Sequence, residues 1–208
     1  MTTIKKILFC LAVIVISHYS FSQSKFGIET GLNLSNARVN SMYGDENVNN
    51  RTGMLLGCFF EFNTSKHFSI QPGFRYIQRG NVSDNGVTKL IQKVNYVEFP
   101  LTCNVIINFN KFKPFLAAGF YFGYYVSANQ TQTYGSGEYY ECDVSDFYKS
   151  SDVGYVLGCG LNYELSKRFD VFMSFYYTGG VKNVLEDEAI GSVSNTGHQL
   201  SAGMKVRL

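Results

Sequence analysis

The sequence predicts an all-β protein, an eight-stranded antiparallel up-and-down transmembrane β-barrel with short periplasmic turns and long outer loops. Three observations predict this fold class. Apolar and polar residues alternate along eight segments of about nine residues or more, the length that a tilted strand needs to cross a bilayer. The links between these segments are alternately short and long. Glycines and charged residues share one face of the segments, while the other face is apolar.

The first 22 residues are predicted to be a cleaved signal peptide, so that residues 23–208 form the barrel domain. Lys5 and Lys6 precede an apolar run over residues 7–16, and small residues stand near the expected cleavage point. The run is too short to be a membrane-spanning helix. The protein is therefore expected to be exported.

Charge and composition narrow the possible classes of protein. Without Lys5 and Lys6, the 18 Lys and Arg residues fall to 16, which equals the 16 Asp and Glu residues. A neutral chain lacks the basic surface that nucleic acids require, so no nucleic-acid partner is expected. The 18 Phe, 15 Tyr and 20 Gly favour sheet over helix. We interpret the cysteines of the mature chain as small hydrophobic residues. They are Cys58, Cys103, Cys142 and Cys159.

The alternation defines the strands in order. The first covers residues 25–35, where Phe26, Ile28 and Leu32 share one face. The same pattern recurs over residues 53–62, 68–79, 96–107, 114–128, 153–165, 169–178 and 197–208. Short links are expected at residues 63–67, 108–112 and 166–168, and long links at residues 36–52, 80–95, 129–152 and 179–196. An even number of strands places both termini at the periplasmic rim and the long links outside.

Two prolines lie inside expected strands. Pro72 and Pro100 each remove a hydrogen bond from the sheet, because proline has no backbone N–H. They are predicted to mark bulges or irregular pairing.

The content of the two faces indicates which one meets lipid. A soluble eight-stranded carrier has an apolar interior, and a membrane barrel reverses this arrangement. Glycines and charges on one face suit a narrow lumen, because small residues leave room for long side chains. The predicted lumen ion-pair network consists of Glu29, Glu61, Arg75, Arg79, Glu98, Lys205 and Arg207. Counting from the termini, Glu29 is expected to face Lys205 or Arg207. A soluble β-sandwich is the alternative fold.

Three short motifs carry a family resemblance. They are the segments Ser69–Tyr76 (SIQPGFRY), Tyr96–Leu101 (YVEFPL) and Lys113–Leu116 (KPFL). The chain resembles the PorT-like outer-membrane β-barrel family of the Bacteroidetes over nearly all of its mature length. Family members often carry Glu where this chain has Gly73, so a role tied to that carboxylate is not carried over. The resemblance implies a location in the outer membrane of a Gram-negative bacterium, surrounded by outer-membrane lipid.

No residue pattern points to an enzyme, and neither a cofactor nor a metal is expected. His67 falls in a short turn, and His198 is the only histidine near the outer rim, with Ser192 and Ser194 in the preceding link. The sequence contains no glycine-rich phosphate loop and no zinc-ligand spacing.

The third long link is the candidate interaction loop. Its residues are Tyr134, Tyr139, Tyr140, Glu141, Asp143, Asp146, Phe147 and Tyr148. Tyrosine offers rigid amphipathic contact area, so this loop suits a protein or glycan partner. A solvated loop folded over the barrel mouth is the alternative. Calcium held by the carboxylates is a further alternative, although the spacing lacks the EF-hand pattern.

The sequence thus leads to a functional hypothesis with two alternatives. We expect a non-enzymatic outer-membrane barrel with a largely plugged polar lumen and a structural or adhesive role through its outer loops. A narrow passive channel is the first alternative. The second, implied by the family resemblance, is an accessory subunit of an outer-membrane protein secretion complex.

Overall fold

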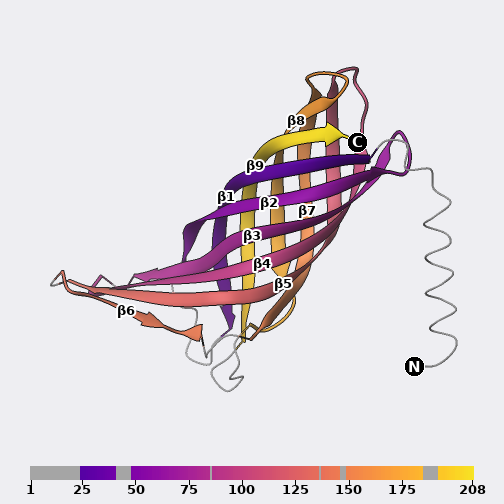
Figure 1. The fold of residues 1–208 in the computed structure, drawn as a ribbon. Helices are drawn as coiled ribbons and strands as arrows, with labels where there is room; N and C mark the ends of the chain where they lie inside the picture. Colours follow the sequence, from indigo (N-terminus) through magenta and orange to yellow (C-terminus); the bar gives the residue numbers. More distant parts are fainter. Residues whose placement is uncertain (1–23, 41–47, 85, 136, 146–148, 185–191) are drawn as a thin grey trace, which may run out of the picture.

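The computed structural model describes residues 24–40, 48–84, 86–135, 137–145, 149–184 and 192–208. Residues 1–22, where a signal peptide is predicted, lie outside this part, as do Asp146, Phe147 and Tyr148. Its strands are β1 (Ser24–Asn40), β2 (Val48–Asn63), β3 (Phe68–Asp84), β4 (Thr88–Ile106), β5 (Phe112–Tyr134), β6 (Tyr139–Asp143), β7 (Ser151–Glu164), β8 (Phe169–Gly180) and β9 (Ser192–Arg207) (Figure 1). No helix long and apolar enough to cross a membrane occurs among the described residues.

Eight of these strands close into a ring. Their hydrogen-bonded order is β4-β3-β2-β1-β9-β8-β7-β5, and a further pairing of β4 with β5 joins the two ends. All neighbours pair antiparallel. The predicted eight-stranded up-and-down β-barrel is therefore confirmed. Strand β6 is an addition to the prediction, since its residues are expected to form a loop. It pairs with β5 outside the ring.

The two rims of the barrel differ in their connections. The turns at residues 64–67, 107–111 and 165–168 lie at one rim, together with the start of β1 and the end of β9 (Figure 1). There the backbone N–H of Leu208 donates to the carbonyl of Ser24 at 3.0 Å. We call this end the short-turn rim and the opposite end the long-hairpin rim.

The long links of the prediction are largely strand. Residues 80–95 are expected to form a loop, but β3 continues to Asp84 and β4 starts at Thr88. Likewise β5 continues to Tyr134. The error has a physical cause. Beyond the apolar belt both faces of a hairpin meet solvent, so the alternation by which strands are recognised disappears. Figure 1 shows the far ends of β4 and β5 projecting from the ring with β6 beside them.

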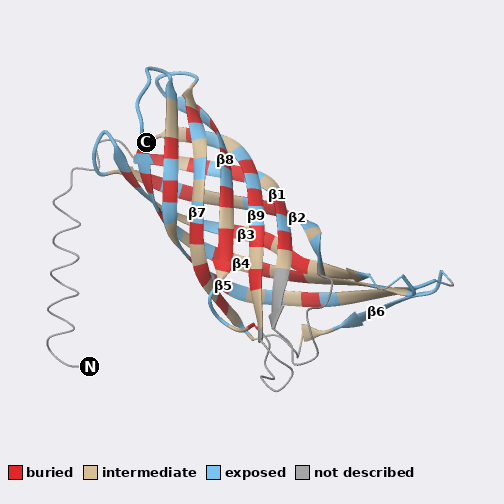
Figure 2. Cartoon of the chain, turned by 180° about the vertical axis from the view of Figure 1, so that it is seen from behind, coloured by how far each residue is buried: buried red, intermediate tan, exposed pale blue. Residues whose placement is uncertain are grey.

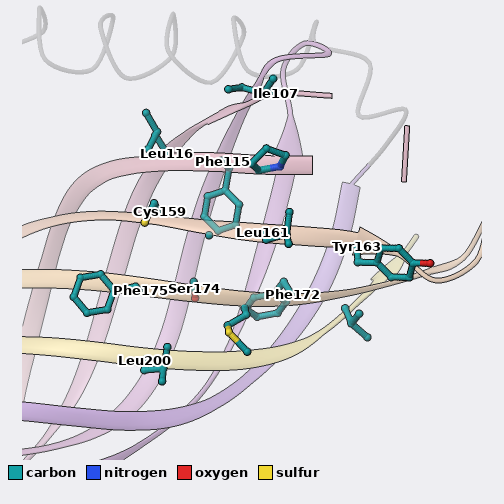
Figure 3. A pocket seen from close by; sticks show the side chains of 14 residues that line it. Ile107, Phe115, Leu116, Cys159, Leu161, Tyr163, Phe172, Ser174, Phe175 and Leu200 are labelled. Atoms are coloured by element: carbon teal, nitrogen blue, oxygen red, sulfur yellow. The ribbon is translucent and has the colours of Figure 1, made fainter. Parts of the chain in front are cut away.

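Buried and exposed residues alternate along the ring strands (Figure 2). The outward leucines at the centre of the apolar belt have 50–55% of their surface exposed, and they are Leu32, Leu56, Leu101, Leu157 and Leu200. An apolar hollow on the outside of β5, β7 and β8, lined by residues that include Leu116, Leu161 and Met173, continues this belt (Figure 3). Charged side chains such as Glu61 and Arg79 point inward and are buried. This is the reverse of a soluble carrier, and the interior and exterior faces lie as the alternation predicts.

The lumen is less polar than the sequence predicts. Inward glycines accommodate aromatic rings, since a Cβ on Gly158 would lie 2.3 Å from Cδ1 of Tyr176, and one on Gly27 would lie 2.3 Å from Cζ of Phe59. Two apolar clusters occupy the interior. One contains Ile106, Phe115, Ala117, Tyr121, Val156 and Tyr176, and the other contains Leu55, Ile77, Val94, Tyr96 and Ala128. The interior therefore combines apolar packing with buried charges.

The two strand prolines interrupt the sheet without shifting it. Pro72 pairs with Leu101 and Arg75 pairs with Glu98 in one register, but the two positions between them are unpaired. The predicted irregular pairing is confirmed, and it takes the form of a gap rather than a bulge.

Candidate functional site: the lumen networks and the sheet extension

Glu98 on β4 is the centre of a buried ion-pair group. Its carboxylate accepts a hydrogen bond from Nε of Arg75 at 3.0 Å, and from Nε and Nη2 of Arg79 at 2.8 and 2.6 Å. The two arginines lie on β3 four residues apart, so both side chains leave the same face of that strand. None of the three side chains is more than 3% exposed. One carboxylate therefore faces two guanidinium groups.

Arg79 also reaches the opposite wall of the lumen. Its Nη1 donates to Oγ1 of Thr178 on β8 at 3.3 Å, and its guanidinium carbon lies 5.0 Å from the ring centroid of Tyr121 on β5. The Tyr121 hydroxyl donates to Asp152 on β7 at 3.0 Å, and Asn195 on β9 donates to the same carboxylate at 2.9 Å. The Asp152 carboxylate is thereby connected to Arg79 through the ring and hydroxyl of Tyr121. We name this group the arginine layer, comprising Arg75, Arg79, Glu98, Tyr121, Asp152, Thr178 and Asn195.

A second ion-pair group lies nearer the short-turn rim. Nζ of Lys205 on β9 lies 2.5 Å from Oε2 of Glu61 on β2. Nζ of Lys25 on β1 lies 3.5 Å from Glu61 and 2.8 Å from Asp170 on β8. These two lysines and two carboxylates, which we name the lysine layer, are balanced in charge. They join four strands across the interior.

Three aromatic rings surround the ammonium group of Lys205. Its Nζ lies 5.4, 5.6 and 5.0 Å from the ring centroids of Phe59, Phe115 and Phe172. The rings come from β2, β5 and β8, so they approach the cation from several sides of the barrel. Aromatic faces attract cations and also exclude water. The lysine layer is thereby packed with apolar side chains rather than with solvent.

The charges at the short-turn rim are more accessible. Glu164 accepts from Nζ of Lys113 at 2.7 Å and lies 3.0 Å from Nη2 of Arg207, which also lies 3.2 Å from Asp170. A vestibule of about 500 Å³ opens there and is lined by polar residues that include Lys25 and Glu164. The lumen is thus entered from this rim as far as the lysine layer.

Glu29 faces the lumen but does not form the predicted ion pair. In the register of β1 and β9, Glu29 lies opposite Gly203, while Lys205 lies opposite Gly27. Glu29 accepts a hydrogen bond from Ser201 at 3.1 Å, and Lys205 contacts Glu61 instead. The expected pairing of Glu29 with Lys205 or Arg207 is therefore wrong. Counting from the termini determines the face of a strand, but it leaves the register open by two residues.

The structure also places three buried charged residues in these layers that the predicted network omits. Lys25 and Asp170 lie at the alternate strand positions whose side chains point inward, so the alternation of polar and apolar residues could have identified them. Asp152 falls in a segment predicted to be a loop, where no parity is assigned. Its inward position follows from the start of β7 at Ser151.

The predicted interaction loop is largely a sheet extension. We define the extension as Thr88–Asn95 of β4, Ser127–Tyr134 of β5, and β6; it begins where the β4–β5 register shifts between Asn95 and Tyr96. All five residues of β6 are exposed. Tyr140 packs edge-on to Tyr134 at 6.0 Å, and Asn129 donates to Glu141 at 3.1 Å.

The carboxylates of this extension do not form a metal site in the part of the chain that the structure describes. No group of three or more His, Cys, Asp or Glu side chains is arranged there to hold a metal ion. Hydrogen bonds from the hydroxyl and the backbone N–H of Ser145 lower the pKa of Asp143. Asp143 therefore carries its negative charge over an extended range of pH.

Neither His67 nor His198 has a hydrogen bond from its imidazole ring to a serine hydroxyl or a carboxylate among the described residues. Nδ1 of His67 lies 3.2 Å from the carbonyl oxygen of Ile106 in the short-turn rim. The His198 ring stacks on Phe175 at 5.9 Å on the outward face of the barrel. These contacts are those of structural side chains at the two rims.

Comparison with solved structures identifies similar barrels. One is a major outer membrane protein from Thermus thermophilus, with a TM-score of 0.51, 12% identity, and coverage of 89% of this chain and 99% of that one. Another is Neisserial surface protein A, with a TM-score of 0.45, 14% identity, and coverage of 88% and 97%. A third is Ail, the attachment invasion locus protein of Yersinia pestis, in complex with the heparin analogue sucrose octasulfate, with a TM-score of 0.40, 16% identity, and coverage of 88% and 99%. At these identities the likeness concerns the fold.

The family of the chain follows from its sequence. No curated protein matches it. Residues 21–186 match the model of a family described as the outer membrane protein beta-barrel domain, and this range contains every ring strand except β9. The matched segment, the closed ring of strands and the apolar outer face all indicate an outer-membrane β-barrel. The chain therefore belongs to the outer membrane protein beta-barrel domain family and is a barrel of the Gram-negative outer membrane.

Proposed function

We propose that this protein is a non-enzymatic outer-membrane barrel with a plugged lumen, which acts through the surface of its long-hairpin rim. The proposal includes a cleaved signal peptide over residues 1–22 and an outward-facing long-hairpin rim, because even-stranded barrels keep both termini and their short turns in the periplasm. The motifs SIQPGFRY, YVEFPL and KPFL support placing the chain near the PorT-like members of its family.

The observation that carries the plugged lumen is the presence of two charge layers that cross it. The arginine layer joins β3 to β8 through Arg79 and Thr178, and the lysine layer joins β2 to β8 through Glu61, Lys25 and Asp170. Between these layers lies a cavity of about 20 Å³, lined by residues that include Glu29. Such a cavity has room for about one water molecule. Opening a pore would break buried ion pairs, which is strongly unfavourable.

Planar-bilayer recording tests the plugged lumen. The full-length mature protein is expected to give no stable conductance steps at neutral pH. A variant that combines Arg79→Ala and Glu98→Ala with Glu61→Ala and Lys205→Ala removes the centres of both layers together with their countercharges and is expected to conduct. Heat-modifiable gel mobility would verify that both proteins are folded. Stable pore-like conductance by the wild-type protein would contradict the proposal.

A narrow passive channel is the second candidate, and the vestibule of about 500 Å³ is the observation that favours it. The vestibule admits water and small ions up to the lysine layer. A channel requires that the lysine layer open. If the protein is a channel, the double variant Lys205→Met with Glu61→Gln should therefore conduct more than the wild-type protein. A double variant as silent as the wild-type protein would exclude this route.

The exposed aromatic residues support an interaction role for the extension. Tyr139 is 72% exposed and Tyr140 is 62% exposed, so both rings are accessible to a partner. Loops and hairpins on a rigid scaffold are frequent sites of binding. We propose a protein or a glycan as the partner. Adhesion of cells that express the wild-type protein, compared with cells that express Tyr139→Ser with Tyr140→Ser, tests the role.

A further inference from the structure

Strand β6 is an open edge of the sheet. In the part of the chain that the structure describes, the strand order ends at β6, which pairs with β5 alone. In this pairing Tyr134 N–H donates to the carbonyl of Glu138 at 2.9 Å, and Val144 N–H donates to the carbonyl of Ala128 at 3.1 Å. An antiparallel ladder bonds every second residue, so Tyr140 and Cys142 also face β5. The backbone N–H and C=O groups of Tyr139, Glu141 and Asp143 consequently point away from the sheet.

Such an edge is normally covered or protected. Unpaired N–H and C=O groups along a strand are a template on which another extended chain can pair. Here they belong to a strand whose five residues are all exposed, held out from the barrel on the projecting ends of β4 and β5 (Figure 1). Among the described residues, no further strand pairs with this side of β6.

The charge of this edge selects its partner. Residues 134–145 contain Glu138, Glu141 and Asp143 but no Lys or Arg. Within the described residues, none of these carboxylates forms an ion pair. Opposite charges directly across a strand pair are stabilising, and like charges are destabilising. Pairing of β6 with β6 of a second copy around its centre would oppose Glu141 to Glu141, which disfavours self-association.

We propose that β6 binds an extended segment of a partner protein by strand addition, and that this segment carries Lys or Arg opposite the β6 carboxylates. Backbone hydrogen bonds to Tyr139, Glu141 and Asp143 supply affinity, while the charges and the exposed tyrosines supply selectivity. The inference deepens the proposed function, because it rests on the extension being outside the cell and names the class of partner.

A peptide-binding experiment on the full-length protein in detergent micelles tests this inference. The probe is a fluorescent peptide in which lysine alternates with threonine, and binding is followed by fluorescence polarisation. One control peptide carries glutamate in place of lysine. The other keeps every lysine but is N-methylated on alternate backbone nitrogens, which prevents strand pairing without changing charge. We expect the lysine peptide to bind, and both controls to bind at least about ten-fold more weakly.

Two variants at one position separate the backbone from the charge. Glu141→Pro removes an N–H that points away from β5, so β6 should keep its place while the open edge is blocked. It is expected to lower the affinity for the lysine peptide by about ten-fold or more. Glu141→Gln keeps the N–H and removes the charge, so its affinity should fall by up to about five-fold. Both variants should show the heat-modifiable mobility of the wild-type barrel.

Several outcomes would overturn the inference. Equal binding of the N-methylated and unmodified peptides would mean that charge alone attracts the peptide. Equal binding by the wild-type protein and Glu141→Pro would place the contact elsewhere, and absence of binding by the lysine peptide would exclude the proposed partner. If the wild-type protein formed dimers and Glu141→Pro were monomeric, the partner of the open edge would be a second copy of the chain. None of these results affects the conductance test of the lumen, so the two proposals fail independently.

Discussion

The buried pair between Glu61 and Lys205 illustrates how single residues hold this barrel together. Replacing Lys205 by Met keeps much of the side-chain volume among the three phenylalanine rings, but it leaves Glu61 with Lys25 alone, at 3.5 Å. Removing one partner of a buried ion pair costs about 3–5 kcal/mol, because a charge remains without compensation. We expect a loss of that size in urea unfolding followed by heat-modifiable gel mobility.

Two comparisons make this prediction specific. Lys205→Met combined with Glu61→Gln should recover part of the loss, since neither charge then remains unpaired. Glu164→Gln at the partly exposed short-turn rim should cost no more than about 1 kcal/mol, as surface ion pairs contribute little. A Lys205→Met protein as stable as Glu164→Gln would show that the lysine layer does not carry the stability assigned to it.

Glycine at position 119 is required by close backbone contact. A Cβ there would lie 2.1 Å from the carbonyl oxygen of Leu101, an atom of the neighbouring strand that cannot move aside. Gly123 on the same strand and face is the matched control, because its Cβ would meet nothing nearer than 3.5 Å. Gly119→Ala should destabilise the barrel by about 1–3 kcal/mol in the same urea assay, and Gly123→Ala should be tolerated. Equal stability of the two variants would contradict the argument.

At the residue scale, the sequence predicts the face of a side chain better than its partner. Glu29, Glu61 and Lys205 all point inward as their parity requires, because the two-residue period of a strand leaves no other choice. The actual partners of Glu29 and Lys205 could not be predicted in the same way. A shift of two residues preserves every face and changes every neighbour. The lumen partners therefore depend on the register of the whole ring.

At the scale of the strands, the apolar belt was predictable and the extension was not. Inside the membrane, lipid on one side and a packed lumen on the other impose strict alternation, as in Leu157 and Leu161 of β7. In the outer part of the extension, residues 88–93 and 129–134, by contrast, no position is buried, and both faces meet water. Residues 88–93 of β4 show no alternation of buried and exposed positions, so their sequence carries no strand signal. Their pairing with β5 became evident only from the structure.

A lysine placed on the lipid face should distinguish the belt from the extension. Leu157 lies near the middle of β7 with 51% of its surface exposed on the outward face. Leu157→Lys is expected to cost about 2–4 kcal/mol if the position lies at the bilayer midplane, when unfolding is measured in lipid vesicles. Thr131→Lys in the extension is the control and should change the unfolding free energy little, because that position meets water. Similar values for both variants would argue against the membrane placement of the ring.

For the molecule as a whole, orientation connects the barrel to its proposed role. The start of β1, the end of β9 and the three short turns share one rim, and the extension lies at the other. Thiol labelling of the native cysteines can test which rim faces the outside of the cell. Cys142 lies exposed on β6, whereas Cys103 and Cys159 are exposed on the lipid-facing side of the ring. A charged thiol reagent needs water to react, since the thiolate is the nucleophile.

A membrane-impermeant maleimide applied to intact cells should therefore label the protein at Cys142. Cys142→Ser should abolish the labelling, because Cys58, Cys103 and Cys159 all lie at outward positions of ring strands, where lipid shields them from the reagent. In that background, Ser65→Cys places a thiol in the turn between β2 and β3, and it should react only after the outer membrane is permeabilised. If intact cells were labelled at Ser65→Cys, and the wild-type protein were not labelled at Cys142, the barrel would have the opposite orientation in the membrane. The strand-addition site would then face the periplasm, and its partner would have to be sought there.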